Sequence, residues 1–277
     1  MTTVIQNNNF PPNLLSIKPP IKKLYCQGVW DLAILNKSIA IVGSRRITSY
    51  GERVIEKIVP FLVEANVTII SGMMYGVDQK AHNVCLECGG KTIAVLGWGL
   101  TWPGLGEEDK KMQKKIVEHG GILISEYEAQ PPSLWMFPQR NRIVAGLAQA
   151  VLVVEAGEGS GSLITARLAT KMDKKLFAIP GPITSSTSKG TNDLIKQGKA
   201  ILVSDVNDIL SNLNWPTQSS SLQGLTPKGL VIDLEDGIDV DELARKVKKN
   251  VQEVGTELSL LVLKGIVKEK NGKYFRI

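Results

Sequence analysis

Short apolar runs rich in β-branched residues alternate with helical patterns along the middle of the chain, and this alternation limits the possible folds most strongly. The runs lie at residues 39–42, 67–70, 92–96, 122–124, 151–154, 176–179 and 200–203. Nearly continuous apolar runs are typical of strands buried on both faces, as in a mostly parallel sheet. Helical patterns fill the gaps, for example at residues 51–64 and 163–171. We therefore predict a doubly wound α/β domain over residues 39–210.

The sequence on either side of this domain follows different patterns. Residues 1–38, which include an Asn- and Pro-rich stretch, are predicted to form an N-terminal extended arm. Residues 211–224 are polar and rich in turn formers, which is typical of a linker. Residues 225–277 contain helical patterns at 240–247 and 251–263, followed by two short runs around Asn271-Gly272, a strong hairpin signal. Two helices and a hairpin predict a small winged-helix-like domain.

The charge of the chain permits an anionic partner without identifying one. The formal net charge is +6 over 277 residues, and the isoelectric point is about 9.1. The excess is spread along the chain, so we do not predict a continuous basic surface that coats nucleic acid. Any anion site should be a focused pocket of a few side chains and backbone amides.

The cysteines, histidines and apolar runs exclude several other classes of protein. No apolar run reaches the roughly 18 residues that cross a bilayer, so we predict no membrane association. Three cysteines are too few for a disulfide framework, and the cytoplasm is the expected compartment. His82, Cys85 and Cys88 stand three residues apart on a helical pattern, so they fan around a helix instead of converging. We predict no metal, no cofactor and no catalytic residue.

Glycine-rich turns follow several of the predicted strands. Gly43-Ser44-Arg45 ends the first run, Ser71-Gly72 the second, Gly97-Trp98-Gly99 the third, and residues 155–162 the fifth. In an open α/β sheet, ligands bind outside the carboxyl ends of the strands, where free amides and helix N-termini favour phosphate. Glycine lets the backbone approach a ligand closely, and Arg45 adds a fork for phosphate oxygens. We predict one pocket, lined by Gly43, Ser44, Arg45, Ser160, Gly161 and Ser162.

Residues 137–142 place an aromatic ring, two arginines and an asparagine together before the fifth run. These residue types suit a single-stranded nucleic acid, and the candidates are Phe137, Arg140, Asn141 and Arg142. The alternatives are that Phe137 is a core residue and that Asn141 caps a helix. Lys91, before the third run, is a further phosphate candidate, although a lysine there is more often a solvated strand start.

Several sequence blocks, taken in order, resemble those of the DNA-processing protein A family, also called DprA or Smf. They are IAIVGSR at 39–45, SGMMYGVD at 71–78, GGKTIAVLG at 89–97, FPQRNRIVAG at 137–146, VVEAGEGSGSLITA at 153–166 and FAIPGP at 177–182. The resemblance covers about residues 10–210, and the fourth and fifth of these blocks are its most specific parts.

The resemblance implies an extended Rossmann-like domain that binds single-stranded DNA without catalysis. It also implies a homodimer that protects incoming single strands and loads the recombinase RecA on them in natural transformation. The family's basic pocket corresponds here to Arg45, Lys91 and Arg140. Tyr75 departs from the family pattern, in which a basic residue is common just before the motif at residues 76–78.

Two other functions fit parts of the sequence. A Rossmann-like hydrolase of the phosphoribohydrolase type also has a glycine-rich turn, but an acidic residue follows it, and residues 163–169 contain none. A duplex-binding protein acting through the C-terminal domain is disfavoured because Glu253 and Glu257 on its second helix repel phosphate. Single-stranded DNA binding is the predicted function, and the nucleotide-binding hydrolase is the alternative.

Overall fold

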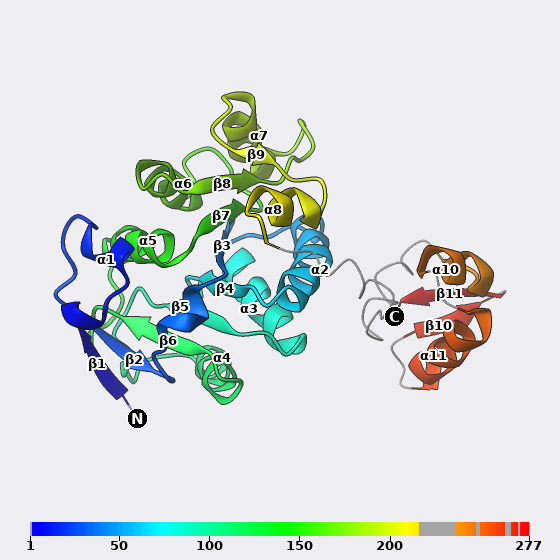
Figure 1. Ribbon diagram of the computed structural model, residues 1–277, viewed down its shortest axis with the longest axis horizontal. Coiled ribbons are helices and arrows are strands. Elements are labelled where there is room, and N and C mark those ends of the chain that lie inside the picture. The colour runs from blue at the N-terminus through cyan, green and yellow to red at the C-terminus, as the bar shows by residue number, and fades with distance from the viewer. Residues whose placement is uncertain (1, 216–236, 248–249, 264–266, 271, 277) are drawn as a thin grey trace. The chain divides into compact units, whose positions relative to one another are not determined.

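The computed structural model describes residues 2–215, 237–247, 250–263, 267–270 and 272–276. The chain divides into two compact units, Met1–Trp215 and Pro216–Ile277 (Figure 1). Separate clusters of buried apolar side chains form the cores of the two units.

The first unit is built on one nine-stranded sheet with a parallel centre. The strand order is β1-β2-β6-β5-β4-β3-β7-β8-β9, in which β1 and β2 are antiparallel and the other seven strands are parallel. The strands are β1 (Thr2–Gln6), β2 (Lys23–Gln27), β3 (Ser38–Val42), β4 (Thr68–Ser71), β5 (Thr92–Val95), β6 (Ile122–Ser125), β7 (Ala150–Val153), β8 (Lys175–Ala178) and β9 (Ile201–Leu202). The seven parallel strands occupy the seven apolar runs, which confirms the predicted α/β fold.

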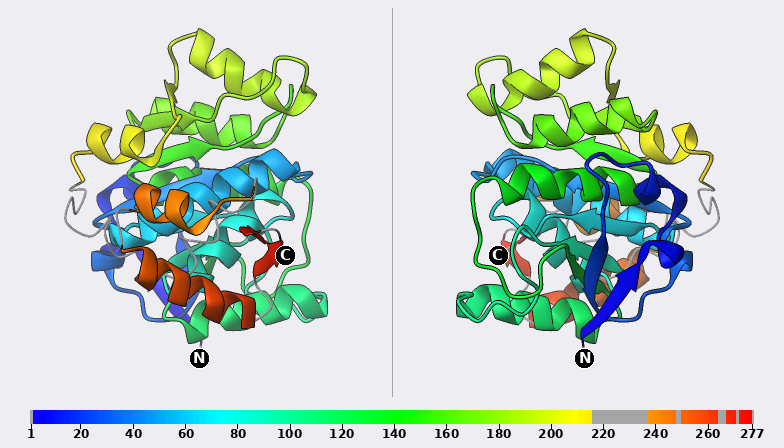
Figure 2. Two further views of the ribbon diagram at one scale, coloured as in Figure 1. Left: turned by 90° about the vertical axis from the view of Figure 1, so that its right-hand side faces the viewer. Right: turned by 90° about the vertical axis from the view of Figure 1, so that its left-hand side faces the viewer.

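Helices connect the parallel strands and cover both faces of the sheet (Figures 1 and 2). They are α1 (Pro12–Leu15), α2 (Ser49–Glu64), α3 (Val77–Glu87), α4 (Glu107–Glu118), α5 (Met136–Leu147), α6 (Ser162–Lys171), α7 (Lys189–Lys196) and α8 (Val206–Asn212). Short 3-10 helices lie at η1 (Asn7–Asn9), η2 (Leu32–Leu35) and η3 (Ser186–Ser188). Within the described parts of the chain, no helix combines the length and the apolar character needed to cross a membrane.

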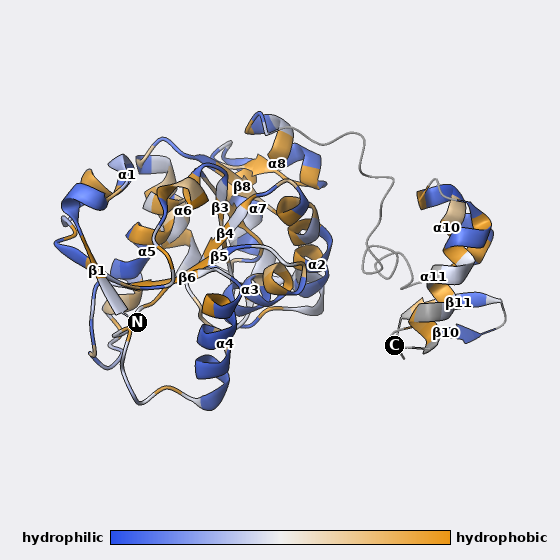
Figure 3. Cartoon of the chain, turned by 60° about the horizontal axis from the view of Figure 1, so that its bottom comes forward, coloured by the Kyte–Doolittle hydropathy of each residue, from blue (hydrophilic) through white to orange (hydrophobic). Residues whose placement is uncertain are grey.

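Each face of the sheet has its own core because successive strand residues point in opposite directions. Ala40 and Val42 of β3 belong to a cluster with α1, α5 and α6, whereas Ile39 and Ile41 belong to a cluster with α2, α3 and α8. Figure 3 shows hydrophobic residues along the strands and a largely hydrophilic α4. Burial on both faces explains why the parallel strands are continuous apolar runs in the sequence.

The N-terminal segment is part of the sheet, instead of forming the extended arm expected for residues 1–38. β1 pairs with β2, and β2 pairs with β6, so both strands continue the sheet beyond its parallel part. Leu24 and Cys26 are fully buried, and Phe10 and Leu14 pack into the same core. In β1 only Ile5 is buried, and the buried residues of β2, Leu24, Tyr25 and Cys26, include none that is β-branched, so this segment lacks the β-branched apolar run that marks the parallel strands.

The first unit also extends beyond residue 210, the expected end of the α/β domain. α8 continues to Asn212, and Trp215 is only 7 % exposed because it packs into the cluster that contains α2 and α3. The expected linker at 211–224 therefore begins inside this unit. Residues 216–224 lie outside the described residues.

The second unit contains two helices and a hairpin. Its elements are α10 (Val240–Val247), α11 (Val251–Leu263), β10 (Val267–Lys270) and β11 (Lys273–Arg276), and the two strands are antiparallel. Leu243, Val254 and Val267 are buried in its core, while Glu253 is exposed. The predicted helices and hairpin are confirmed, and the winged-helix-like assignment stays a prediction.

Candidate functional site

A hollow of about 1050 Å³ lies outside the carboxyl ends of β3, β4 and β7. The strand order reverses at β3, since the chain proceeds from β3 to β4 on one side and later adds β7 on the other. Turns that leave adjacent strands in opposite directions open a crevice at such a point, where α/β proteins bind ligands. The structure therefore places a hollow where the sequence predicts a pocket.

Nine of the eleven predicted site residues line this hollow, and two do not. The nine are Gly43, Ser44, Arg45, Phe137, Arg140, Asn141, Ser160, Gly161 and Ser162. They come from three places in the fold, namely the turn after β3, one face of α5, and the turn that leads from β7 into α6. Their role in binding stays a prediction, but their meeting at one site is a fact of the fold.

The turn after β3 holds Arg45 at the hollow. The Ser44 hydroxyl accepts a hydrogen bond from the Arg46 amide at 3.0 Å and donates to the Arg46 carbonyl at 2.8 Å, which closes the turn. A Cβ at Gly43 would lie 2.6 Å from Val77, so glycine lets β3 and α3 approach closely. The exposed Arg45 guanidinium lies 5.3 Å from the centre of the Phe137 ring, a cation–π contact.

α5 presents Phe137, Arg140 and Asn141 on one face because residues three and four apart are neighbours on a helix. The half-buried Phe137 ring packs edge-on against Trp98, with 6.4 Å between the ring centres. A Cβ at Gly97 would lie 2.7 Å from the Phe137 ring. The turn after β5 therefore supports Phe137 from behind instead of lining the hollow, which corrects the expectation for that turn.

Arg140 is the buried cation at the base of the hollow. It is 4 % exposed, and its guanidinium donates to the carbonyls of Gly72 and Val95 at the ends of β4 and β5. Burial lowers the pKa of Arg140 to about 10, while the nearby Asp78 opposes this shift, so the side chain stays charged at neutral pH. Glycine is needed at position 72 because a Cβ there would overlap the guanidinium.

The turn after β7 brings the N-terminus of α6 to the hollow. The hydroxyl oxygens of Ser160 and Ser162 lie 2.8 Å apart. Asn141 ties this turn to α5, since its side-chain amide donates to the Gly161 carbonyl at 3.3 Å and accepts from Arg140 Nε at 3.2 Å. Asn141 lies within α5, so the alternative that it caps a helix is wrong. The positive end of the α6 dipole adds to the attraction for an anion.

Two glutamates near the hollow are held by structural partners. Glu155, which follows β7, is 2 % exposed and accepts hydrogen bonds from the Thr48 amide at 2.9 Å and the Thr48 hydroxyl at 2.5 Å. Thr48 is the N-cap of α2, so this carboxylate fixes the start of that helix. Glu158 forms an exposed ion pair with Lys189 at 2.5 Å, which cancels both charges locally.

The remaining acid of the hollow, Asp78, lies beneath it. Asp78 is buried and accepts from the Met74 amide at 3.3 Å. Burial raises the pKa of Asp78, and the charge of Arg140 opposes that rise. By contrast, neither Arg45 nor Arg46 forms an ion pair with any described residue, and both are exposed. The hollow therefore presents positive charge to the solvent.

Lys91 lies at the amino ends of the parallel strands, and its assignment to the pocket is wrong. It precedes β5, so it stands at the amino end of that strand, whereas the hollow lies at the carboxyl ends. Its carbonyl accepts from the Ile69 amide and from the Cys85 thiol, while its side chain is exposed. The solvated strand start that the sequence left open is what the structure contains.

Arg142 is a structural residue, and its assignment to the pocket is also wrong. Two residues along a helix turn the side chain by about 200°, so Arg142 points away from the face of α5 that carries Arg140. It is 3 % exposed and forms a buried ion pair with Glu126 at 2.6 Å. Burial raises the pKa of Glu126, and the charge of Arg142 opposes that rise.

Three further residues that line the hollow were not predicted from the sequence. Arg46 stands in the same turn as Arg45 and could have been chosen by its position alone. No sequence pattern indicated Lys189 as a site residue, because only the folding of the segment between β8 and α7 brings it beside the hollow. Leu134 precedes α5 and lines the hollow while 86 % exposed, an arrangement that periodicity does not reveal.

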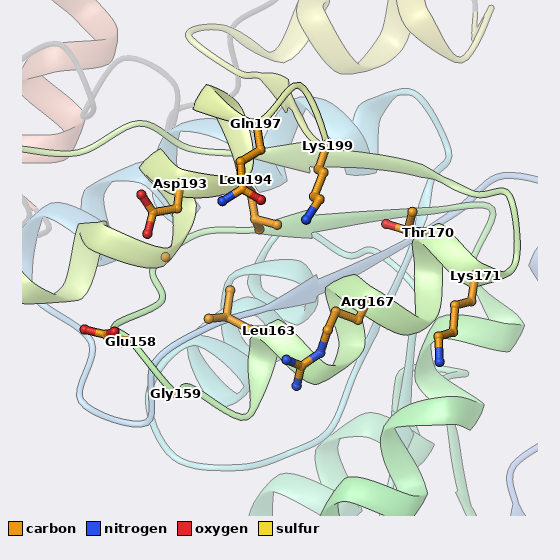
Figure 4. Close-up of a pocket in the computed structure, with 11 residues that line it drawn as sticks. Glu158, Gly159, Leu163, Arg167, Thr170, Lys171, Asp193, Leu194, Gln197 and Lys199 are labelled. Atoms are coloured by element: carbon orange, nitrogen blue, oxygen red, sulfur yellow. The ribbon is translucent and has the colours of Figure 1, made fainter.

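A second hollow of about 560 Å³ lies between α6 and α7 (Figure 4). Leu163 and Leu194 line its middle, with Glu158 and Asp193 toward one end and Arg167 toward the other. Glu158 also lines the first hollow. Lys171 and Lys199 also line the second hollow, so its lining carries charges of both signs.

Fold and site together define an α/β protein with a Rossmann-like sheet and a cationic hollow at the point where the strand order reverses. The sequence matches the family described as DNA recombination-mediator protein A over residues 1–214. It is 37 % identical over 283 residues to protein Smf of Escherichia coli K12, covering 97 % of this chain and 75 % of that protein. The chain therefore belongs to the DNA recombination-mediator protein A family.

Solved structures agree with this assignment. The X-ray structure of DNA processing protein A from Streptococcus pneumoniae matches with a TM-score of 0.68 and 36 % identity, covering 76 % of this chain and 73 % of that one. DNA processing protein A from Helicobacter pylori, whose structure concerns its single-stranded DNA binding mode, matches with a TM-score of 0.68 and 31 % identity, covering 77 % and 95 %. The resemblance found in the sequence and the Rossmann-like fold it implied are confirmed.

Proposed function

We propose that this protein binds single-stranded DNA, with weak sequence preference, in the hollow at the carboxyl ends of β3, β4 and β7. The observation that carries the proposal is the exposed Arg45 guanidinium stacked on the half-buried Phe137 ring, above the buried Arg140. Guanidinium groups bind phosphate oxygens with two parallel hydrogen bonds, and aromatic rings stack on unpaired bases. Both elements of single-strand recognition stand at one site.

The size and composition of the hollow support the same ligand. Its volume of about 1050 Å³ is at the upper end of small-molecule pockets, which span about 300–1,000 Å³, so it has room for more than a single small metabolite. Arg45 and Arg46 lie at the surface with no ionic partner among the described residues, and the α6 N-terminus lies beside them. A polyanion that continues beyond the hollow matches this open, cationic arrangement better than an enclosed metabolite does.

Family membership supports the proposal independently. The Helicobacter pylori relative, which matches over 95 % of its own chain, has a single-stranded DNA binding mode. The nine predicted residues that line the hollow come from sequence blocks that this chain shares with the family.

We further propose that binding occurs without chemical conversion. Each acidic residue at or beside the hollow has a structural role: Glu155 fixes the start of α2, Glu158 pairs with Lys189, and Asp78 supports Arg140. A phosphoribohydrolase needs a carboxylate free to act on its substrate. Incubation with nucleoside monophosphates should release no free base, and release of base would support the hydrolase instead.

The wider role proposed here rests on the family alone. The family description, a DNA recombination mediator, supports delivery of the bound strand to the recombinase RecA. Natural transformation, a homodimeric state and a cytoplasmic location are proposed on the same basis. Assembly of RecA on oligonucleotides coated with a single-strand binding protein, with and without this protein, tests the delivery step directly.

Fluorescence anisotropy with labelled oligo-dT and a hairpin duplex of equal length tests the central proposal. We expect tighter binding of the single strand. Three phosphate contacts, at Arg45, Arg46 and Arg140, should give a slope of log K against log salt near −2, from about −0.7 per phosphate. Affinity that does not depend on salt, or a preference for the duplex, would contradict the proposal.

A further inference from the structure

The cationic hollow contains an ion pair between two side chains that both line it. Lys189 Nζ lies 2.5 Å from Glu158 Oε2, and each residue belongs to the lining. The Lys189 side chain is 56 % exposed and the Glu158 side chain 79 %, so a ligand can reach both groups. Lys189 stands at the start of α7, a different place in the fold from those that supply the predicted residues. One cation of the hollow is therefore bound to a carboxylate where DNA can reach both.

The backbone around the two residues is held in place by contacts other than the ion pair. The Gly190 amide donates to the Ala156 carbonyl at 2.7 Å, which joins the start of α7 to the turn after β7. A Cβ at Gly190 would lie 2.7 Å from that same carbonyl oxygen, so glycine permits this close approach. Because these contacts hold the two segments together, the ion pair can open by movement of its two side chains alone.

An exposed ion pair of this kind is a weak competitor of a DNA phosphate. Exposed pairs of lysine and carboxylate favour the closed arrangement by at most about fivefold, and many contribute nothing measurable. A lysine that contacts a phosphate of a single strand gains a similar attraction and also releases a counterion from the DNA. At a slope of about −0.7 per phosphate, this release favours the contact by about fivefold at 0.1 M salt and about 25-fold at 0.01 M salt.

From this comparison we propose that Lys189 is a further phosphate-binding residue of the hollow, and that Glu158 is an internal competitor which single-stranded DNA displaces. The inference rests on the proposed function and extends it beyond the arginines. In the free protein, Glu158 neutralises the lysine and restrains its flexible side chain at the site. In the complex, a phosphate replaces the carboxylate, and the exposed Glu158 side chain moves away from the strand. Because Glu158 can pair with Lys189 again as the phosphate leaves, the pair also speeds release of the strand.

The two members of the pair should affect binding in opposite directions. In anisotropy titrations with oligo-dT at 0.1 M salt, Lys189→Ala should weaken binding by about fivefold, the contribution of one released counterion. Glu158→Gln keeps the size of the side chain, removes the competing charge and should tighten binding by about 2-fold to 5-fold. Lys189→Arg keeps a cation and should bind within about twofold of the parent.

Salt dependence and kinetics test the same competition. With Lys189 as a fourth phosphate contact, the parent's slope of log K against log salt should lie near −3, instead of the −2 expected from the three arginines alone. Lys189→Ala should return the slope to about −2, and Glu158→Gln should leave it near −3 because the lysine still meets a phosphate. In stopped-flow measurements with excess unlabelled competitor, labelled oligo-dT should leave Glu158→Gln more slowly than it leaves the parent.

The carboxyl group of Glu158 reports whether the ion pair opens. The hydrogen bond from Lys189 lowers the pKa of Glu158, so displacement of the carboxylate by a phosphate should raise that pKa. Carbon-13 NMR of the side-chain carboxyl carbon, assigned by its loss in Glu158→Gln, follows the pKa with and without oligo-dT. An unchanged pKa in the complex would show that the pair stays closed and would refute the displacement.

The exposed pair of Lys114 and Glu118 on α4 provides the matched control. Its nitrogen–oxygen distance is 3.7 Å, and neither residue lines the hollow. Lys114→Ala and Glu118→Gln change the net charge by the same amounts as the test variants and should each leave oligo-dT binding within about twofold, since salt screens distant charges. Equal effects in the two pairs would mean that binding follows net charge and would overturn the inference.

The outcomes distinguish this inference from the proposed function. If the parent does not bind oligo-dT, the proposed function fails and the inference fails with it. If the parent binds and Lys189→Ala binds equally tightly while folded by circular dichroism, Lys189 is no contact and the hollow retains its arginines. Lys189→Gln, which keeps more of the side chain, takes the place of the alanine variant if that variant does not fold. Weaker binding by Glu158→Gln would show that the closed pair is needed and would refute the competition.

Discussion

Arg45 and Lys91 provide a matched pair of cations that tests whether the hollow or the general charge of the protein binds DNA. Both side chains are exposed, and alanine at either position removes one positive charge. Arg45 lies at the carboxyl ends of the strands beside Phe137, whereas Lys91 lies at the amino end of β5. A charge-assisted hydrogen bond is worth about 1.5–3 kcal/mol, so Arg45→Ala should weaken single-strand binding by about 10-fold to 150-fold.

The fold should tolerate the Arg45→Ala substitution. The side chain is exposed, and its one described contact with a ring, the cation–π contact with Phe137, is worth about 0.5–1 kcal/mol at an exposed site. The free energy of unfolding should therefore fall by no more than about 1 kcal/mol, which urea denaturation can measure. Arg45→Lys keeps the charge without the planar fork and should bind between the parent and the alanine variant.

Anisotropy titrations of oligo-dT at several salt concentrations complete the test. Arg45→Ala should make the slope of log K against log salt less negative by about 0.7, because one phosphate contact is lost. Lys91→Ala should leave the affinity for oligo-dT within about twofold, since the Lys91 charge lies at the other end of β5 from the hollow and salt screens it from the bound DNA. Equal losses in both variants would mean that binding follows net charge and would refute the assignment of the hollow. So would an Arg45→Ala variant that binds as tightly as the parent.

Three further predictions follow from buried groups and from the boundary between the units. Arg142→Ala should lower the free energy of unfolding by about 3–5 kcal/mol, measured with urea, because Glu126 is left buried without its partner; an unchanged midpoint would contradict this. Burial lowers the pKa of His82 to about 3, so below its unfolded value of about 6.5 protons bind mainly to the unfolded chain, and stability falls by about 2 kcal/mol from about pH 7 to about pH 5. A His82→Asn variant should lose that part of the pH dependence in the same urea assay. A fragment of residues 1–219, which keeps the buried Trp215, should fold and bind oligo-dT within a few-fold of the full chain, and loss of binding by the folded fragment would place the main site in the second unit.

The parallel sheet was predictable because its strands are buried on both faces. Residues 39–42 and 151–154 carry almost no polar side chain, so their apolar runs mark β3 and β7 without ambiguity. The antiparallel strands β1 and β2 gave no such signal. In β1 only Ile5 is buried, and a strand with one buried position cannot be told from an extended arm by its sequence.

The site residues were predictable where they lie in a turn that follows a parallel strand. They were not predictable where the strand end or the helix face that carries them decides their position. Arg45 and Ser160 lie in the turns that follow β3 and β7, so the common direction of these parallel strands determines that both lie at the carboxyl ends. The assignment of Lys91 to the pocket was wrong because Lys91 precedes β5, and a lysine next to a strand does not by itself indicate whether it lies at the end of the strand that faces the pocket. Arg142 was assigned wrongly because the sequence does not show which face of the helix it occupies. Two residues of rotation separate Arg140, at the base of the hollow, from Arg142, which pairs with Glu126.

Arg140 at the base of the hollow and Arg45 at its surface differ in how much side-chain conformational freedom they would lose on binding a ligand. The guanidinium of Arg140 is already held by the carbonyls of Gly72 and Val95, so a ligand meets its charge in a set position. A free arginine side chain carries about 2 kcal/mol of rotamer entropy, and Arg45, restrained on one side by Phe137, retains part of it. The hollow thus combines a rigid charge with an adjustable one. A strand whose phosphates vary in spacing can be anchored at depth by the first and followed at the surface by the second.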